Sequence, residues 1–277
     1  MTVPDRFFEL PDLTWRPAGY SVVLECLTQQ QQQAVKRSGL KRILGFRPLH
    51  PDAWPWFVGA LGEIHVGRLL AKLGPEWSVL HAVPGGTGDT DIDHVVIGPA
   101  GVFTINTKHH RGARVWVSPR LLMVAGQKMD HLRNSRSEAK SASKRFSNAI
   151  GSPVAVHPLI VIVGARDLTI KQRPDGVSVL TGTQLLRWLR RQKPAVDETT
   201  LARLRQVAMT PRFWHETADV AVDPAHMVAF AALQAEDSQA RRRRVGWMLL
   251  VLAGVGAALA LAGPSLVSIL VQSITGL

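Results

Sequence analysis

The chain is poor in cysteine and in acidic residues. Cys26 is the single cysteine among 277 residues, so an intramolecular disulfide is excluded and a reducing compartment is favoured. One thiol also argues against a structural zinc site, which usually takes about four ligands with cysteine among them. The 21 acidic residues are outnumbered by 33 basic ones, giving a net charge of +12. This charge favours nucleic acid or anionic lipid as a partner.

Several motifs are also missing. The chain has no G-x-x-x-x-G-K phosphate loop and no G-x-S-x-G nucleophile elbow, which argues against a P-loop nucleotidase and against a serine hydrolase. No internal repeat is present. The first residues lack a positively charged start followed by a long apolar core, so no cleavable signal peptide is expected.

The C-terminal part is long, apolar and uncharged. Arg241–Arg244 form a run of four arginines, and no charged residue follows in Val245–Gly263. At 1.5 Å per residue these roughly 19 residues reach about 28 Å as a helix, close to the hydrocarbon thickness of a bilayer. The sequence therefore predicts a single-pass cell-membrane protein, with the arginines and the main domain on the cytoplasmic side. Pro264 is expected to end or kink the helix, or the span extends towards Leu277; the alternative is a buried core helix.

Two other segments concentrate positive charge. Without the four arginines the chain still carries 29 basic and 21 acidic residues, or +8. Lys36–Arg47 mixes basic and apolar side chains, as expected either for a short amphipathic segment on a membrane or for an ordinary surface helix. Lys128–Arg145 is predicted to be a helix with several basic residues on one side, which either contact a phosphate backbone or are simply solvated. The predicted nucleic-acid contacts on this helix are Lys128, Arg133, Arg136 and Lys140.

A β-hairpin is predicted within Asp89–Gly112. Ile92–Ile97 and Val102–Thr107 are short β-branched runs on either side of the turn signal Gly-Pro-Ala-Gly. Pairing Ile97 with Val102 would place Asp93 opposite Asn106 and Asp91 opposite Lys108. Because side chains alternate between the faces of a strand, two sets result. The polar set is Asp91, Asp93, Asn106 and Lys108, and the apolar set is Ile92, Val96, Phe103 and Ile105.

This polar set suits metal-assisted chemistry. Mg²⁺ takes oxygen ligands from one or two carboxylates together with water and phosphate, and it activates the bound water. A nearby lysine can hold the attacking water or offset developing negative charge. Asp93 would be the ligand and Lys108 the lysine. The alternative is a solvated strand at a sheet edge.

A helix is predicted over Asp52–Gly74, because Leu61, Ile64, Leu69, Leu70 and Leu73 form an apolar stripe and Gly-Pro follows. Small residues such as Gly59 and Gly62 would let this helix approach a sheet closely. Glu63 would then reach the polar side of the hairpin, unless it is an ordinary solvated carboxylate.

Three motifs together resemble a known family. G-A-L-G-E at Gly59–Glu63, D-I-D-H-V-V-I-G at Asp91–Gly98 and G-V-F-T-I-N-T-K at Gly101–Lys108 occur in the order found in the nuclease-related domain (NERD), a branch of the PD-(D/E)XK nuclease-like superfamily. The resemblance covers roughly Trp54–Gly151. It implies an α/β fold with a restriction-endonuclease-like core, in which helices flank a mixed central sheet.

The resemblance also implies a site. Glu63, Asp93 and Lys108 match the family's catalytic positions, and Mg²⁺ or Mn²⁺ would be bound by Asp93, Glu63 and the residue that precedes the lysine by two. That residue is Asn106, where the family has an acid. Three hypotheses follow: Asn106 is a neutral ligand, Asp91 or Glu138 replaces the acid, or the domain is an inactive module that binds nucleic acid or a protein at the membrane.

The neighbouring histidines are weaker candidates. His109 and His110, at the end of the second strand, are predicted to contact phosphate. His94 should point away from Asp93 and lie in the core or behind the site. Three such histidines do not make a convincing zinc site, because His109 and His110 would face opposite ways.

The predicted organisation has four parts. They are an N-terminal helical and basic amphipathic segment (1–50), the nuclease-like domain (51–210), a linker with the basic run (211–244) and the transmembrane helix (245–263). Further strands are expected at Arg114–Val117, Leu121–Ala125, Val154–Val163 and Val177–Leu180, and further helices at Gln184–Arg191 and Thr199–Met209.

Overall fold

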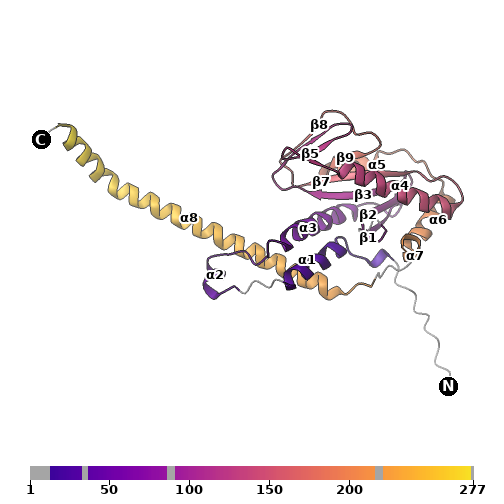
Figure 1. The fold of residues 1–277 in the computed structure, drawn as a ribbon, viewed down its shortest axis with the longest axis horizontal. Coiled ribbons are helices and arrows are strands. Elements are labelled where there is room, and N and C mark those ends of the chain that lie inside the picture. The colour runs from indigo at the N-terminus through magenta and orange to yellow at the C-terminus, as the bar shows by residue number, and fades with distance from the viewer. Residues whose placement is uncertain (1–12, 33–36, 86–90, 216–220, 276–277) are drawn as a thin grey trace, which may run out of the picture. The chain divides into compact units, whose positions relative to one another are not determined.

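The computed structural model describes residues 13–32, 37–85, 91–215 and 221–275, with side chains up to residue 260 (Figure 1). The chain divides into two compact units. Unit 1 comprises Met1–Cys26 and Trp54–Met227, and unit 2 comprises Leu27–Ala53 and Val228–Leu277. Residues 86–90, which include Asp89 at the start of the predicted hairpin unit, lie outside the described residues.

Helices and strands follow one another in groups along the described residues, with helices at both ends and α4 between two groups of strands. The helices are η1 (Leu13–Trp15), α1 (Tyr20–Gln32), α2 (Gly39–Ile43), α3 (Ala53–Leu70), α4 (His131–Ile150), α5 (Gly182–Arg190), α6 (Glu198–Met209), α7 (Pro211–Trp214) and α8 (Pro224–Thr275). The strands are β1 (Ser78–Val83), β2 (Ile92–Gly98), β3 (Gly101–His109), β4 (Arg114–Val117), β5 (Leu122–Val124), β6 (Gln127–Met129), β7 (Val156–Val163), β8 (Asp167–Ile170) and β9 (Ser178–Thr181).

A mixed five-stranded sheet forms the centre of unit 1. Its order is β1-β2-β3-β7-β9, with antiparallel pairs from β1 to β3 and parallel pairs from β3 to β9. Helices α3 and α5 pack on one face against Val96, Phe103 and Ile105. Helices α4 and α6 pack on the other face against Val95 and Ile97. The predicted α/β fold, with helices on both sides of a mixed sheet, is confirmed (Figure 1).

The hairpin β2–β3 has the predicted register. Ile97 pairs with Val102, and the ladder continues to His94 and Ile105. One predicted position is wrong: Ile92 packs in the cluster of Val95 and Ile97, not with Val96. The ladder between β1 and β2 is interrupted at Ala82, whose φ of +47° lies in the left-handed region. Side chains at the start of β2 therefore do not continue the regular alternation between the two faces of the sheet.

A second sheet, of order β6-β5-β4-β8, packs Val115 and Leu122 against Ile160 of the central strand β7 in a further apolar cluster. It corrects the prediction for Lys128. That residue lies on strand β6 opposite Met123, and helix α4 begins only at His131. The cause is a tight turn at Ala125 and Gly126, both with positive φ, which forms a hairpin from β5 and β6.

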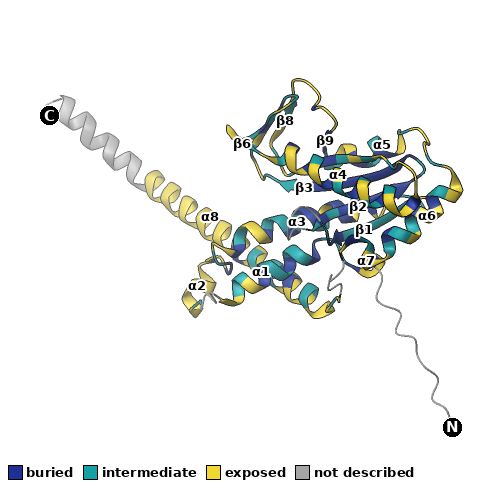
Figure 2. Ribbon diagram, turned by 45° about the vertical axis from the view of Figure 1, so that its right-hand side comes forward, coloured by how far each residue is buried: buried dark blue, intermediate teal, exposed yellow. Residues whose placement is uncertain are grey.

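The segment predicted as a linker, 211–244, is mostly helical. Pro211–Trp214 form α7, and Trp214 is fully buried against Phe146, which attaches this segment to the core of unit 1. Helix α8 begins at Pro224, passes through the arginine run and continues beyond Pro264 to Thr275. Its part Pro224–Ala260 is long and apolar enough to cross a membrane, and Figure 2 colours most of its residues as exposed.

Candidate active site

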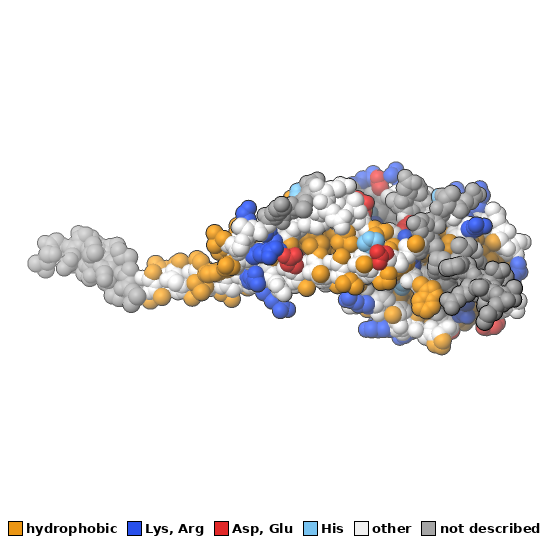
Figure 3. All heavy atoms as spheres, turned by 90° about the horizontal axis from the view of Figure 1, so that it is seen from below, with side chains coloured by type: hydrophobic (Ala, Val, Ile, Leu, Met, Phe, Trp, Pro, Cys, Tyr) orange, Lys and Arg blue, Asp and Glu red, His pale blue; other side chains and the backbone are white. Residues whose placement is uncertain are grey.

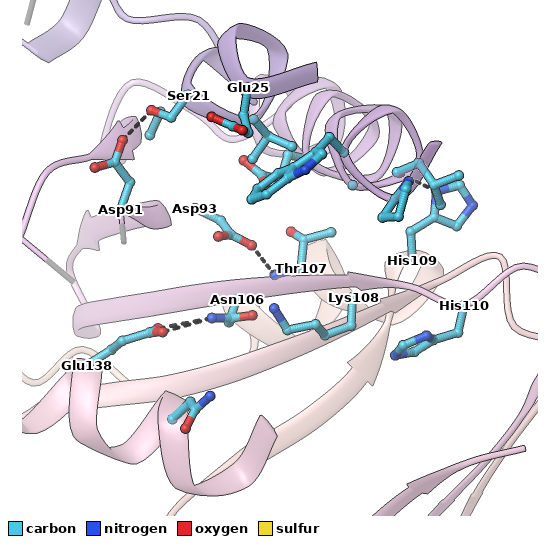
Figure 4. Close-up of a pocket in the computed structure, with 18 of the residues that line it drawn as sticks. Ser21, Glu25, Asp91, Asp93, Asn106, Thr107, Lys108, His109, His110 and Glu138 are labelled. Atoms are coloured by element: carbon cyan, nitrogen blue, oxygen red, sulfur yellow. Dashed lines mark hydrogen bonds between the residues drawn. The ribbon is translucent and has the colours of Figure 1, made fainter. Parts of the chain in front are cut away.

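A pocket of about 1080 Å³ in unit 1 gathers the polar residues of the hairpin. Its walls come from α1, α3, β2, β3 and α4, and Figure 4 shows the side chains converging from these elements. All three predicted catalytic residues, Glu63, Asp93 and Lys108, line it, and so does Asn106. The fold therefore brings together residues from a helix and from two strands.

Glu63 comes from the middle of α3, where a glycine lets the helix approach the sheet. A Cβ at Gly62 would lie 2.9 Å from the Cβ of His109 and 3.3 Å from Cγ2 of Thr107, so a larger residue would push α3 away from β3. Glu63 is only 7% exposed. Burial raises the pKa of its carboxyl well above the usual value, and the Asp93 carboxylate raises this pKa further. The alternative, an ordinary solvated carboxylate, is thus excluded for Glu63.

Asp93 lies near the start of β2 and is fixed by β3. The backbone N–H of Thr107 donates to Oδ2 of Asp93 at 2.5 Å. Burial raises the pKa of Asp93, while the charge of Lys108 and the Thr107 N–H oppose this rise. The hydrogen bond aims the carboxylate across the gap between the two strands and into the pocket.

Asn106 is paired with an acid from another element. Its Nδ2 donates to Oε1 and Oε2 of Glu138, on α4, at 3.0 and 3.1 Å. Glu138 is 5% exposed and lies on the buried face of α4, in line with Ser135 and Ala142. Burial raises the pKa of Glu138 to about 7, although the Asn106 bond favours the carboxylate. A carboxyl group that can replace the acid missing at position 106 is therefore present in the same pocket, 32 residues further along the chain.

Lys108 follows Asn106 by two residues, and Figure 4 shows both side chains on the same side of β3. Its positive charge lowers the pKa of each of three neighbouring carboxyls, those of Glu63, Asp93 and Glu138. One cation thus faces three acids that burial makes reluctant to ionise. The site as a whole favours a further positive charge.

Asp91 lines the pocket but is held by residues upstream of the domain. Ser21 Oγ donates to its Oδ2, and Arg16 Nη2 lies 3.4 Å from the same oxygen. Of the two acids suggested as replacements for the missing one, only Glu138 contacts Asn106 directly.

The three histidines occupy different environments. Nδ1 of His109 contacts the carbonyl oxygen of Val58 at 2.9 Å, and the ring of His110 stacks on that of His131. Both His109 and His110 line the pocket. His94 is fully buried, 2.8 Å from His81 between their Nδ1 atoms, and burial lowers its pKa well below the usual value. The expectation that His94 lies in the core or behind the site is confirmed.

The predicted basic contacts divide into two kinds. Arg133 and Lys140 are exposed on α4, although Arg133 pairs with Asp130 at 3.0 Å. Arg136 instead donates to the carbonyl oxygens of Asp175 and Pro119, which fastens α4 to neighbouring loops. Together with Lys128 on β6, they do not form one continuous stripe along a helix.

Sequence reasoning missed several pocket residues. Arg16 is 7% exposed, and its Nε and Nη1 atoms have no hydrogen-bond partner within the described residues. Glu25, from α1, and the 42% exposed Trp56, from α3, also line the pocket. Arg16 and Glu25 precede the recognisable motifs, so only the fold reveals them. Trp56 stands seven residues before Glu63 in the sequence. A tryptophan so close to a predicted catalytic residue of a basic chain could have been recognised as a candidate for stacking on a base.

Comparison with known proteins agrees with this arrangement. Residues 58–163 match the family model of the nuclease-related domain, NERD. An uncharacterized protein of Bacillus anthracis is 47% identical over 62 residues, which cover 21% of this chain and 29% of that protein. The chain thus matches less than a third of that relative's length. No solved structure matches the chain significantly. The chain contains a nuclease-related domain, as its motifs predicted.

Proposed function

We propose that the nuclease-related domain of this chain hydrolyses phosphodiester bonds of nucleic acid with a divalent cation, at a membrane to which α8 tethers it. The observation that carries the proposal is the pair Asn106–Glu138. It supports a site in which α4 supplies the acid that β3 lacks, so that the pocket retains three carboxylates and a lysine.

The donor set fits Mg²⁺ or Mn²⁺. All candidate ligands are oxygens, as hard cations require: the carboxylates of Asp93, Glu63 and Glu138, and the amide of Asn106. Oδ1 of Asn106 is buried and has no hydrogen-bond partner among the described residues, so this oxygen is available to coordinate a cation. Among the described residues, no three acidic, histidine or cysteine side chains stand close enough to enclose an ion unaided. We infer that the amide, water and substrate phosphate complete the coordination.

A bound cation would lower the pKa of a water ligand and offset charge on the scissile phosphate. The chain's own groups have separate tasks. Lys108 orients the attacking water and balances negative charge as it develops on phosphate. Thr107 holds Asp93 through its backbone N–H, and Glu138 holds Asn106, so that both ligands keep their orientation.

The remaining pocket residues suit the substrate. The exposed face of Trp56 offers a stacking surface for a base. Two nitrogens of Arg16 that have no hydrogen-bond partner among the described residues are suited to a phosphate oxygen, as are two exposed residues outside the pocket, Lys140 and Arg133 on α4. The basic run Arg241–Arg244, immediately before the uncharged part of α8, supports a cytoplasmic position for the domain under the positive-inside rule.

The second candidate is an inactive module that binds nucleic acid or a protein at the membrane. The neutral Asn106 and the incomplete convergence of the acids favour it. The two candidates differ in what a metal does. Cleavage needs the cation and the three acids, whereas simple binding needs only the exposed basic and aromatic side chains.

The test is calorimetric titration of Mn²⁺ into the purified chain, followed by incubation with single- and double-stranded DNA and RNA. Asp93→Asn and Glu138→Gln should abolish both metal binding and cleavage, while Glu198→Gln, at an exposed acid on α6, should change neither. Nucleic-acid binding that persists in all variants, without metal binding in the wild type, would support the inactive module instead.

A further inference from the structure

A short segment of unit 2, residues 38–47, lies on α8 where that helix changes from basic to uncharged. We name it the α2 segment. Arg243 Nη1 donates to the carbonyl oxygen of Arg42, and Trp247 Nε1 donates to that of Ile43, each at 2.9 Å. Gly45 has a φ of +78°, and a Cβ there would overlap the carbonyl oxygen of Ala240. The contacts fix the α2 segment beside residues 240–247.

The α2 segment presents apolar side chains to its surroundings. Leu40, Ile43 and Leu44 are 66%, 56% and 38% exposed, and Phe46 is 53% exposed. The first three follow the i, i+3, i+4 spacing of one helical face, with Lys41 and Arg42 beside them. Four large exposed side chains in ten residues form an apolar patch that marks an interaction site rather than scattered surface residues.

The charges around this patch are positive and largely unbalanced. Both acids of the adjacent part of α8 are paired within the unit, Glu236 with Arg37 and Asp237 with Arg47. The cations that remain exposed are Lys41, Arg42, Arg241, Arg242, Arg243 and Arg244. Figure 3 shows the basic side chains gathered where α2 lies beside α8, next to apolar ones. An apolar patch ringed by cations matches an anionic bilayer surface.

We propose that the α2 segment docks on the anionic phospholipid surface of the bilayer that α8 crosses. Leu40, Ile43 and Phe46 enter the boundary between headgroups and acyl chains, and the surrounding cations contact lipid phosphates. Because Trp247 and Arg243 bind the α2 segment to α8, this contact also fixes the depth of the helix in the membrane. The inference rests on the membrane span included in the proposed function, but not on any cleavage activity.

The test places a fluorescent probe on the patch in the full chain. Leu40→Cys is labelled with a polarity-sensitive dye and reconstituted into phosphatidylcholine vesicles with and without phosphatidylglycerol, some containing spin-labelled lipid as quencher. Burial raises the pKa of Cys26 to about 11, so the native thiol stays largely unlabelled near neutral pH. Thr199→Cys, at an exposed position on α6, serves as the matched control.

We expect lipid quenching at position 40 to exceed that at position 199 several-fold in phosphatidylglycerol vesicles. It should fall without the anionic lipid, in Phe46→Ser and in the double variant Lys41→Gln, Arg42→Gln. A chain that resists carbonate extraction but whose probe is no better quenched than the control would overturn the docking alone. If the probe at position 40 lies in an apolar environment only at a high ratio of protein to lipid, and this signal disappears on dilution with lipid, a second copy of the chain covers the patch instead of the bilayer. A chain released by carbonate would overturn the membrane span itself.

Discussion

Replacing Glu138 with glutamine should remove a pH dependence of stability that the buried carboxyl creates. The amide oxygen of glutamine can still accept the Asn106 hydrogen bond, so the local structure is retained. The folded wild type holds the Glu138 proton up to a pKa of about 7, whereas the unfolded chain releases it near 4.5. Over this window the unfolded state binds fewer protons, so the stability of the wild type falls as pH rises.

The magnitude follows from the gap between the two pKa values. About 2.5 pH units at 1.36 kcal/mol each give about 3 kcal/mol. The free energy of unfolding of the wild type, relative to Glu138→Gln, should therefore fall by about 3 kcal/mol between pH values of roughly 4.5 and 7.5. Below that window the contribution of the Glu138 proton is fully present, and above it the contribution is lost. Other titrating groups largely cancel in the comparison.

The assay is urea unfolding of the full chain in detergent micelles with EDTA, followed by tryptophan fluorescence, since Trp214 is fully buried in the domain core. Glu198→Gln, which alters an exposed glutamate on α6, controls for the loss of a charge. A difference between wild type and Glu138→Gln that stays constant across the pH range would refute the reasoning. If the proposed metal site is correct, saturating Mn²⁺ should reduce the dependence of the wild-type unfolding free energy on pH, because the cation replaces the proton on Glu138.

Three further predictions concern other pocket and surface residues. Trp56→Ala should weaken single-stranded DNA binding roughly tenfold by loss of stacking, as measured by fluorescence anisotropy. Mn²⁺ binding, measured by calorimetry, should be unchanged. If the variant and the wild type bound DNA equally well, Trp56 would not belong to the substrate site. Gly62→Ala should destabilise the domain by about 1–3 kcal/mol, because its new methyl meets His109, and an unchanged urea midpoint would contradict this. Arg136→Ala should lower the free energy of unfolding by about 1–2 kcal/mol, because two carbonyl groups lose their hydrogen-bond donor. Lys140→Glu should lower the affinity for nucleic acid and leave the stability unchanged. If Arg136→Ala lowered only the affinity and Lys140→Glu only the stability, the structural role of Arg136 and the binding role of Lys140 would both be refuted.

The features that the sequence predicted correctly depend on local signals. The register of β2 and β3 follows from a Gly-Pro-Ala-Gly turn between two β-branched runs, and the placement of Glu63 follows from the apolar stripe of α3. Helix α3 ends at Leu70, a few residues before Gly74, because the next residues form tighter turns: the N–H groups of Lys72 and Leu73 donate to the carbonyl oxygens three residues earlier.

The features that the sequence did not reveal depend on tertiary contacts or on unsignalled backbone conformations. The face of Ile92 changes because Ala82, on a neighbouring strand, adopts a positive φ, and alanine gives no warning of this. Lys128 belongs to a strand because Ala125 and Gly126 form a tight turn within a stretch that otherwise resembles a helix. The contact of Arg16 with Asp91 joins residues 75 positions apart.

The pair Asn106–Glu138 has a consequence for how such domains are classified. A motif written as an acid, any residue and a lysine assumes that charge and lysine are held by one strand. In this chain strand β3 supplies only the lysine, and the acid comes from a helix that packs against the strand. A survey that considers only the residue two positions before the lysine would count this domain among those that have lost an acid. A survey that follows spatial neighbours would find the acid still there.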